Sequence, residues 1–337
     1  MDLAMMVKSA DTEELLAERL GRFLRSLLKR PDLQVTNLAR KSTGMSRENW
    51  TFEAGSKGEC STESLILRRD PIGGMLNTDR RAEYEVLVAL HEAGFPIPKV
   101  LGVDLDGGFL ERPSLVMEIA PGACEYFVLT GTRPLETRMR LASNFLQLLV
   151  ELQDIDWKSA GLADTLEDPG ASPALYELDR WHRELERVAL EPMPEMELIR
   201  VWLQKHARTA RKIVLVHGDF KPGNALIHED RVSAVLDWET AHRGDPLEDL
   251  GWITNPARAN EHQIPGHWER EEILTAFRDR TGYKFEDEEV HWWNVFACWK
   301  LAIIVLTGLR STIDGKFDRI HHNPTWLYRR MLKMVEF

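Results

Sequence analysis

The segment Val214–Glu239, VLVHGDFKPGNALIHEDRVSAVLDWE, constrains the fold of this chain more than any other part of it. Short apolar runs alternate here with polar turns, and Asp219, Asn224 and Asp237 stand at the edges of those runs. The pattern indicates short strands joined by turns in a part of the chain that is otherwise mainly helical. Three such side chains in one short segment make it the first place to look for chemistry.

Two strand-like runs in this segment, Ala225–His228 and Val232–Asp237, flank the turn residues 229–231 and predict an antiparallel hairpin. A near-symmetric register sets Asn224 close to opposite Asp237. Because cross-strand partners lie within about 5 Å of each other, the amide oxygen and the carboxylate converge at the open end of the hairpin. A few oxygen ligands with room for water and phosphate suit Mg²⁺ bound with a nucleotide, whereas zinc prefers His and Cys.

Asp219 lies on the loop just before Asn224 and is therefore expected to face the reacting phosphoryl group. A carboxylate there accepts a hydroxyl proton or orients the hydroxyl for in-line attack. The alternative is that the three residues only cap a hairpin, because Asp and Asn favour turns. That alternative explains any one of them, while the ordered set favours phosphoryl transfer to an alcohol.

The sequence HGDFKPGN followed by LDWE resembles the Brenner-type motif of the aminoglycoside phosphotransferase family and its choline-kinase-like relatives. The resemblance implies a kinase of small molecules that uses ATP and Mg²⁺. In it Asp219 matches the catalytic aspartate, and Asn224 and Asp237 match the magnesium ligands. His217 matches the histidine that braces the loop.

The next segment, GDPLEDLGW, resembles the part of the family in which acidic side chains tie the catalytic loop to a helix. Its residues Asp245 and Asp249 are accordingly expected to be architectural rather than catalytic. The resemblance covers residues 35–255 and fades toward the C-terminus, where the acceptor pocket is expected to lie.

Nucleotide-binding residues are expected nearer the N-terminus. The strand Leu65–Arg69 places Arg68 where kinases carry a phosphate-binding lysine, with Glu83 on the following helix as its partner and Glu85 on another face. Arginine can also bind phosphate through two N–H groups, but its larger, planar guanidinium is not interchangeable with the ammonium of lysine. Some family members associated with acyl-CoA dehydrogenases look similar here, with LRR before a Pro- and Gly-containing loop; two solvated strand-end arginines are the alternative.

Two further nucleotide contacts follow from the resemblance. The loop KSTGMSREN, with Gly44 and Ser46, resembles the family's phosphate-covering loop, although an ordinary hairpin turn explains it equally well. Backbone groups of Glu118 and Ala120 are expected to bind the adenine edge in the hinge between two lobes.

The remaining pattern predicts an α+β, bilobal protein-kinase-like fold with a small antiparallel-sheet N-lobe and a larger, mainly helical C-lobe. The lobes are expected at residues 1–117 and 124–337, joined by a hinge at 118–123. The elements that carry this prediction are a helix over 12–30, strands at 33–38, 50–54, 65–69 and 114–119, a helix over 80–93, and helices from Leu135 onward.

Composition excludes several other classes. A net charge of -11 argues against a sequence-independent nucleic-acid binder. The three cysteines form no readable disulfide or metal pattern, and the N-terminus lacks a signal peptide, so a cytoplasmic monomer or homodimer is expected. The apolar stretch Val290–Leu309 is interrupted by His291, Asn294 and Lys300, which favours a buried core helix over a membrane span.

The acceptor is the least constrained part of the prediction. Aromatic residues such as Trp292 and Trp299 favour a partly apolar substrate, such as a hydroxylated acyl or aromatic compound, where they line a cleft. Acidic residues of the same region are what an aminoglycoside-type antibiotic needs, and solvated helix faces explain them as well. A nucleotide-binding pseudokinase and a metal-dependent phosphohydrolase are the rival classes.

Overall fold

The computed structural model describes residues 3–41, 47–56, 62–70, 79–315 and 324–335. Two compact units divide the chain: the first comprises Met1–Val88 and Pro98–Ala120, and the second comprises Ala89–Ile97 and Pro121–Phe337. The end of the first unit at Ala120 falls within the range 118–123 in which a hinge is expected. The expected N-lobe also included residues 89–97, which cluster with the second unit.

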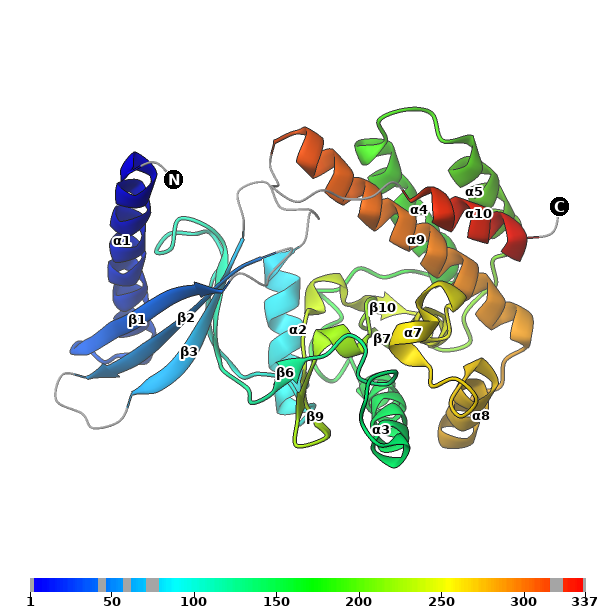
Figure 1. Ribbon diagram of the computed structural model, residues 1–337, viewed down its shortest axis with the longest axis horizontal. Helices are drawn as coiled ribbons and strands as arrows, with labels where there is room; N and C mark the ends of the chain where they lie inside the picture. The colour runs from blue at the N-terminus through cyan, green and yellow to red at the C-terminus, as the bar shows by residue number, and fades with distance from the viewer. Residues whose placement is uncertain (1–2, 42–46, 57–61, 71–78, 316–323, 336–337) are drawn as a thin grey trace. The chain divides into compact units, whose positions relative to one another are not determined.

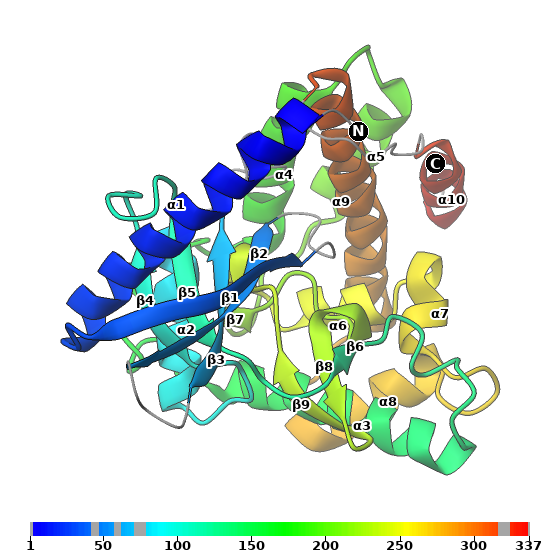
Figure 2. The same cartoon turned by 60° about the vertical axis from the view of Figure 1, so that its left-hand side comes forward.

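The first unit is built on an antiparallel sheet in the order β1-β2-β3-β5-β4. The helix α1 (Leu3–Leu28) lies along this sheet and contacts β1, as both views show (Figures 1 and 2). The strands are β1 (Leu33–Lys41), β2 (Glu48–Ser56), β3 (Glu63–Arg69), β4 (Val100–Asp104) and β5 (Ser114–Glu118).

The core of the first unit forms where the apolar side of α1 packs on the apolar face of the sheet. Leu16, Leu20 and Leu24 recur at helical spacing on α1, while Phe52 and Leu65 stand at inward positions of β2 and β3; all five are buried in one cluster. Burial of each such side chain contributes roughly 1.5–3 kcal/mol. The helix that opens the chain is therefore part of the core of this unit.

The short strand β4 was not expected from the sequence. Its five residues include Gly102, which interrupts the apolar run, but a Cβ there would lie 2.4 Å from Leu27 Cδ2 of α1. The glycine therefore lies against the Leu27 side chain of α1, and it has no positive φ that a turn would require. The helix α2 (Arg80–Glu92) begins in the first unit and ends in the second.

Helices dominate the second unit. Its longest, α9 (Asp287–Ile313, orange in Figure 1), packs against α4, α5, α6 and α10. The described helices of this unit are α3 (Leu135–Asp154), α4 (Pro173–Val188), α5 (Pro194–His206), α6 (Leu247–Ile253), α7 (Ala259–His262), α8 (Arg270–Thr281), α9 and α10 (Thr325–Met334).

The helix α9 contains the apolar stretch noted in the sequence. Within the described residues it is the one helix long and apolar enough to cross a membrane, and 78% of its apolar window is buried inside the protein. Trp292, Phe296 and Trp299 on this helix are buried, whereas Trp326 of α10 is exposed. Burial on all sides is typical of a core helix.

Two small sheets of the second unit carry the chemistry-bearing segment. Strands β7 (Val214–Val216) and β10 (His242–Gly244) pair antiparallel, and β6 (Ala123–Cys124), β8 (Ala225–His228) and β9 (Arg231–Val235) form a sheet in the order β6-β8-β9. The predicted hairpin is thus present. The Leu236 N–H donates to the Asn224 carbonyl at 2.7 Å, so Leu236 stands opposite Asn224, and Asp237 is the next residue along the chain.

The turn of this hairpin has two residues, Glu229 and Asp230, both with positive φ, because Arg231 already pairs with His228. An irregularity between Leu226 and Ile227 then adds one residue to β9, which moves the partner of Asn224 from Val235 to Leu236. Strand β9 ends at Val235, and Asp237 adopts a left-handed conformation with φ 70°.

Candidate functional site

The loop after β7 carries His217, Gly218 and Asp219 in consecutive positions. Asp249 of α6, fully buried, accepts hydrogen bonds from the His217 and Gly218 backbone N–H groups at 2.8 and 2.9 Å. Gly218 has φ +82°, and a Cβ there would lie 2.9 Å from Thr240 Oγ1. The loop is therefore held by α6 and packed too closely on Thr240 for a side chain.

His217 uses both ring nitrogens within this loop region. Its Nε2 lies 2.9 Å from the Leu236 carbonyl, which can only accept, so Nε2 carries the proton. Its Nδ1 accepts from the Asp219 backbone N–H at 3.2 Å. With both nitrogens engaged and the ring fully buried, His217 braces the loop against the segment after β9 and has no nitrogen left for proton transfer.

The Asp219 carboxylate has two unlike oxygen atoms. Its Oδ2 accepts from Lys221 Nζ at 2.5 Å and from Asn224 Nδ2 at 2.9 Å. Its Oδ1 is buried and has no hydrogen-bond partner among the described residues. A buried acceptor without a partner is costly in a folded protein, and it is satisfied when a donor such as a hydroxyl binds there.

Nearby cations keep this carboxylate ionised. Burial by itself would raise the pKa of Asp219, but the charges of Lys221 and Arg258 outweigh it and hold that pKa below its usual value. Lys221 belongs to the HGDFKPGN motif, yet no role for it was read from the sequence.

Asn224 directly precedes β8 and Asp237 follows β9, so both stand at the open end of the β8–β9 hairpin. Asn224 uses its amide nitrogen for Asp219 Oδ2 and the Asp219 carbonyl, at 2.9 and 3.1 Å, so its amide oxygen takes no part in these bonds. The donor set of this corner is therefore an amide oxygen and carboxylate oxygens. This chemistry fits a hard cation such as Mg²⁺, which leaves further positions for water and phosphate.

Asp245 and Asp249 have different contacts. Whereas Asp249 holds the catalytic loop, Asp245 Oδ1 accepts from the N–H of Leu247, the first residue of α6, at 2.8 Å. Burial raises the pKa of Asp245 to about 7, against the lowering effect of this hydrogen bond, and Glu248 adds to the rise. Burial likewise raises the pKa of Asp249. Asp245 thus stabilises the start of α6 rather than the loop itself.

A comparison with protein families identifies the family of this chain. A family model described as the phosphotransferase enzyme family, APH, matches residues 38–285. The chain belongs to the APH phosphotransferase family. The matched range contains the whole HGDFKPGN segment and all residues singled out as candidate site residues.

Acyl-CoA dehydrogenase family member 11 of Rattus norvegicus is similar to this APH-family chain. It is 29% identical over 300 residues, which cover 84% of this chain and 37% of that protein. The chain spans 24% to 37% of the length of the curated relatives it matches first. The resemblance to members associated with acyl-CoA dehydrogenases is therefore confirmed for the part that matches.

Two solved structures share the fold. A provisionally assigned aminoglycoside phosphotransferase from Ralstonia eutropha has a TM-score of 0.71 at 21% identity, covering 94% of this chain and 95% of that one. The ternary complex of APH(4)-Ia with AMP-PNP and hygromycin B has a TM-score of 0.52 at 18% identity, covering 93% and 97%. These likenesses confirm the predicted α+β kinase-like fold, and the family supports a phosphotransferase.

The phosphate-side residues of this APH-family chain lie in the first unit. Glu83 is buried, and its Oε1 lies 3.6 Å from Arg68 Nη1, which brings together the predicted pair. Its Oε2 also lies 2.9 Å from Arg80 Nη1 and 3.4 Å from Arg47 Nη2. Both additional arginines contact Asp70 as well. We call Glu83 with these three arginines and Asp70 the arginine cluster.

Sequence reasoning missed three members of the arginine cluster: Arg47, Arg80 and Asp70. Arg80 stands three residues before Glu83 on α2, and that spacing was a usable signal. Arg47 had no such signal, because it meets Glu83 only through the packing of β2 and α2 in the folded unit.

The remaining residues expected to contact the nucleotide are Glu118, Ala120, Gly44 and Ser46. Glu118 is exposed, and its backbone N–H donates to the Lys99 carbonyl at 2.9 Å, so an adenine contact from this residue would come from its carbonyl. Ala120 is partly buried at the end of the first unit. Gly44 and Ser46 lie outside the described residues.

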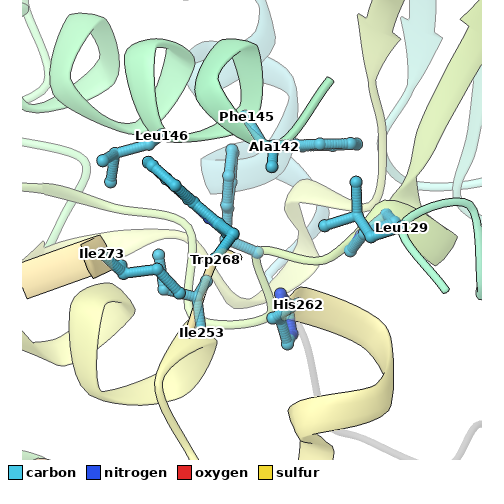
Figure 3. Close-up of a pocket in the computed structure, with 10 residues that line it drawn as sticks. Leu129, Ala142, Phe145, Leu146, Ile253, His262, Trp268 and Ile273 are labelled. Carbon is cyan, nitrogen blue, oxygen red and sulfur yellow. The ribbon is translucent and has the colours of Figure 1, made fainter. Parts of the chain in front are cut away.

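A small cavity borders the catalytic segment in the second unit. It has a volume of about 20 Å³ and is lined by Phe220 and Pro222 of that segment, by apolar side chains of α3 and α6, and by Trp268 (Figure 3). His262 lies at its edge, buried, with Nε2 unpartnered among the described residues. Burial, followed by the charge of Arg258, lowers the pKa of His262 well below its usual value, so the ring is neutral.

Proposed function

We propose that this chain transfers the γ-phosphoryl group of ATP to a hydroxyl group of a small molecule, with Mg²⁺, and that Asp219 orients or deprotonates that hydroxyl. The observation that carries the proposal is the asymmetry of the Asp219 carboxylate. Lys221 and Asn224 hold Oδ2, while the buried Oδ1 has no partner among the described residues. Oδ1 is thus suited to accept a hydrogen bond from the acceptor hydroxyl.

The reaction follows from this geometry in one displacement. The acceptor oxygen forms a bond to the γ-phosphorus, the bond from that phosphorus to the β–γ bridging oxygen breaks, and ADP leaves. The hydroxyl proton passes to Asp219 Oδ1 or to the new phosphate group. Because Lys221 holds Oδ2 and keeps the carboxylate ionised, Oδ1 stays available as acceptor at neutral pH.

Asn224 and Asp237 would hold Mg²⁺, which neutralises phosphate charge when bound. On the phosphate side, we propose that Arg68, held by Glu83, takes the place of the usual lysine, with Gly44 and Ser46 covering the phosphates and Glu118 and Ala120 at the adenine. His217, Asp245 and Asp249 support the loop and α6.

We further propose that the acceptor is partly apolar, such as a hydroxylated acyl or aromatic compound. The support is that the side chains around Phe220 and Pro222 are apolar, with the neutral His262 among them; the cavity they enclose, about 20 Å³, has room for a water molecule and not for the acceptor itself. A polycationic aminoglycoside needs carboxylates instead. A cytoplasmic location, and a monomer or homodimer, stay predictions.

The decisive test is ATP turnover in magnesium buffer against a panel of hydroxyacyl-CoA esters, phenolic and macrolide alcohols, sugars, choline-like amines and aminoglycosides. The comparison is between the natural protein, Asp219→Ala and the matched control Asp179→Ala, whose side chain is 70% exposed. We expect acceptor-dependent ADP release that only Asp219→Ala abolishes.

Binding separates this proposal from its rivals. We expect Mg·ATP to raise the Tm of the natural protein and of Asp219→Ala alike. Mg·ATP binding without turnover on any acceptor would favour a pseudokinase, and release of inorganic phosphate from phosphate esters without ATP would favour a phosphohydrolase. A preference for aminoglycosides would reverse the acceptor assignment.

A further inference from the structure

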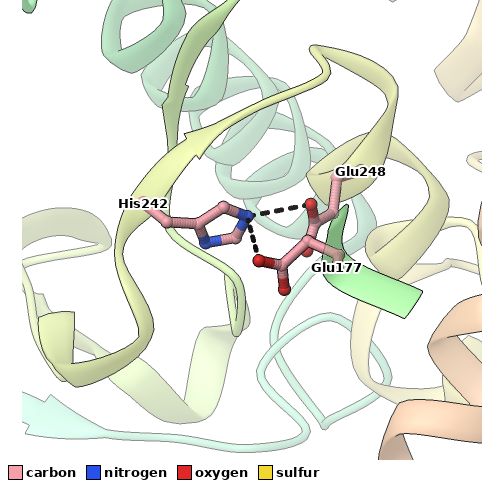
Figure 4. A group of neighbouring side chains, drawn as sticks. All are labelled: Glu177, His242 and Glu248. Carbon is pink, nitrogen blue, oxygen red and sulfur yellow. Dashed lines mark hydrogen bonds and ion pairs between the residues drawn. The ribbon is translucent and has the colours of Figure 1, made fainter. Parts of the chain in front are cut away.

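A cluster of buried ionisable side chains lies beneath the catalytic loop in the second unit. Glu177 of α4, His242 of β10 and Glu248 of α6 bring their ligand-type atoms within 4.8 Å of one another. His242 Nε2 lies 3.0 Å from Glu248 Oε2 and 3.7 Å from Glu177 Oε1 (Figure 4). Two carboxylates and an imidazole are a plausible metal-binding set, so their other partners decide what the cluster does.

Protein cations already neutralise both carboxylates. Arg180 Nη1 lies 3.0 Å from Glu177 Oε1, and Lys300 Nζ lies 3.5 Å from Glu248 Oε1. His242 Nδ1 lies 2.9 Å from the Thr240 carbonyl, so it carries a proton. His242 Nε2 faces carboxylate oxygens, which also only accept. The imidazole is therefore a cation, and a divalent metal would add positive charge to a cluster in which three cations already surround two carboxylates.

The charge of His242 agrees with this geometry. Burial by itself would lower the pKa of His242, but Glu177 and Glu248 outweigh it and raise that pKa above its usual value. The same surroundings act on Glu177: burial opposes ionisation, and Arg180, His242 and Lys300 nevertheless lower its pKa to about 2.

Lys300 connects this cluster to the catalytic loop. Its side chain is buried on α9, and Nζ donates to the Gly218 carbonyl at 2.8 Å. The same ammonium lies 5.2 and 5.4 Å from the ring centroids of Trp181 and Trp252. A buried ammonium needs both hydrogen bonds and counter-charge, and here the loop supplies one and Glu248 the other.

The peptide groups around Gly218 are therefore held from two sides. Asp249 accepts from the Gly218 N–H, and Lys300 donates to the Gly218 carbonyl, which belongs to the peptide bond that leads into Asp219. A Cβ on Gly218 would lie 3.3 Å from Lys300 Nζ, so the loop is packed directly on the ammonium.

We propose that Lys300 is a positioning residue for Asp219, which fixes the Gly218–Asp219 peptide and thereby directs Asp219 Oδ1 toward the acceptor hydroxyl. This inference rests on the catalytic role proposed for Asp219. Glu248 positions Lys300, and Glu177, Arg180 and His242 keep Glu248 in place.

The test compares Lys300→Met, which keeps the length of the side chain but removes the charge, with Lys300→Arg and with the surface control Lys212→Met. Hydrogen–deuterium exchange of the backbone amides of residues 214–225, turnover and the Kd of Mg·ATP are measured for each. We expect faster exchange in this segment for Lys300→Met and a kcat lowered by about 10- to 100-fold, because small displacements of a catalytic group have effects of this size.

The Kd of Mg·ATP should stay within about threefold, partial recovery is expected in Lys300→Arg, and Lys212→Met should match the natural protein. Where Lys300→Met does not fold, Glu248→Gln replaces it and is expected to give the same loop-specific change. Unchanged exchange and kcat in the substituted protein would overturn the proposal, as would an equal increase in exchange over the whole unit.

Two outcomes separate this inference from the proposed function. Absence of turnover in the natural protein would count against the kinase, while loop exchange still tests the Lys300 contact. One equivalent of a tightly bound divalent metal, lost in His242→Gln, would show that the cluster is a metal site and would overturn the ion-pair arrangement.

Discussion

Each of the two units buries a glutamate among cations, but the clusters differ in composition. In the arginine cluster Glu83 contacts three guanidinium groups. In the second unit Glu248 contacts an imidazole and an ammonium. Guanidinium groups stay charged at all ordinary pH values, whereas imidazole titrates near neutrality. The arginines of the first cluster therefore stay charged across the ordinary pH range, whereas the charge of His242 in the second cluster depends on pH.

The two clusters also have different neighbours. Arg47 of the arginine cluster belongs to the segment KSTGMSREN, which is expected to cover the phosphates. The charges in the second unit face helices and the backbone of the catalytic loop. The arginine cluster is therefore suited to bind an anion, and the cluster around Glu248 is suited to hold a backbone conformation. The following predictions test these two roles.

The largest effect is expected at the catalytic carboxylate. Asp219→Asn keeps the size of the side chain but removes the charge, and should lower kcat by about 10²–10⁴-fold, as loss of a general base does. The Kd of Mg·ATP should change little, since the arginine cluster is intact. Steady-state kinetics measure kcat and calorimetric titration measures the Kd of Mg·ATP. An equal loss in turnover and in affinity would contradict the separate roles of the two clusters.

Breaking the arginine cluster should act on stability. Glu83→Gln leaves buried guanidinium groups without their shared counter-charge, and we expect about 3–5 kcal/mol less free energy of unfolding. The control is Glu85→Gln on the same helix. Glu85 lies 3.9 Å from Arg81, whose side chain is exposed, so the free energy of unfolding should change by no more than about 0.5 kcal/mol. Urea unfolding followed by circular dichroism measures both, and similar losses in the two variants would refute the prediction.

A pH-dependent effect is expected at Asp245. The folded-state pKa, about 7, lies above the unfolded value. Between pH 4 and 7 the unfolded chain therefore releases a proton that the folded protein keeps, so stability falls as pH rises through this window. Asp245→Asn removes this penalty and should stabilise the protein by about 2–4 kcal/mol more at pH 8 than at pH 4.

The measurement for Asp245 is the difference in unfolding free energy between the natural protein and Asp245→Asn across that pH range. The Leu247 N–H can still donate to an asparagine oxygen, so the hydrogen bond is retained. A difference that is constant with pH would show that the carboxyl is ionised in the folded state.

The smallest effect is expected at Arg68. Arg68→Met should weaken binding of Mg·ATP about tenfold, or about 1.4 kcal/mol, with kcat at saturating ATP little changed. Arg68→Lys should keep affinity within about threefold, since it retains a cation at the position that a lysine occupies in kinases. Isothermal titration of Mg·ATP decides, and equal affinity in Arg68→Met would remove Arg68 from the nucleotide site.

Sequence reasoning succeeded where the signal was local. The helices that include residues 12–28, 80–92 and 287–313, and the hairpin at Ala225–Val235, follow from periodicity and turn residues within short windows. The turn of that hairpin is one residue shorter than expected, since Arg231 pairs with His228, and a strand irregularity that the local pattern does not contain sets the pairing beyond it. The strand β4 was missed because Gly102 interrupts its apolar run.

By itself the sequence determined the family and the fold class, and it pointed to Asp219, Asn224 and Asp237 as candidate site residues, because they are separated by few residues and carry oxygen donors. The tertiary structure alone decided which charges are buried together. Lys300 stood in the sequence as an interruption of an apolar helix, and it meets Gly218 across 82 residues. Pairing of buried charges depends on segments far apart in the chain packing together, and the low polarity of the interior then makes each unmade contact costly.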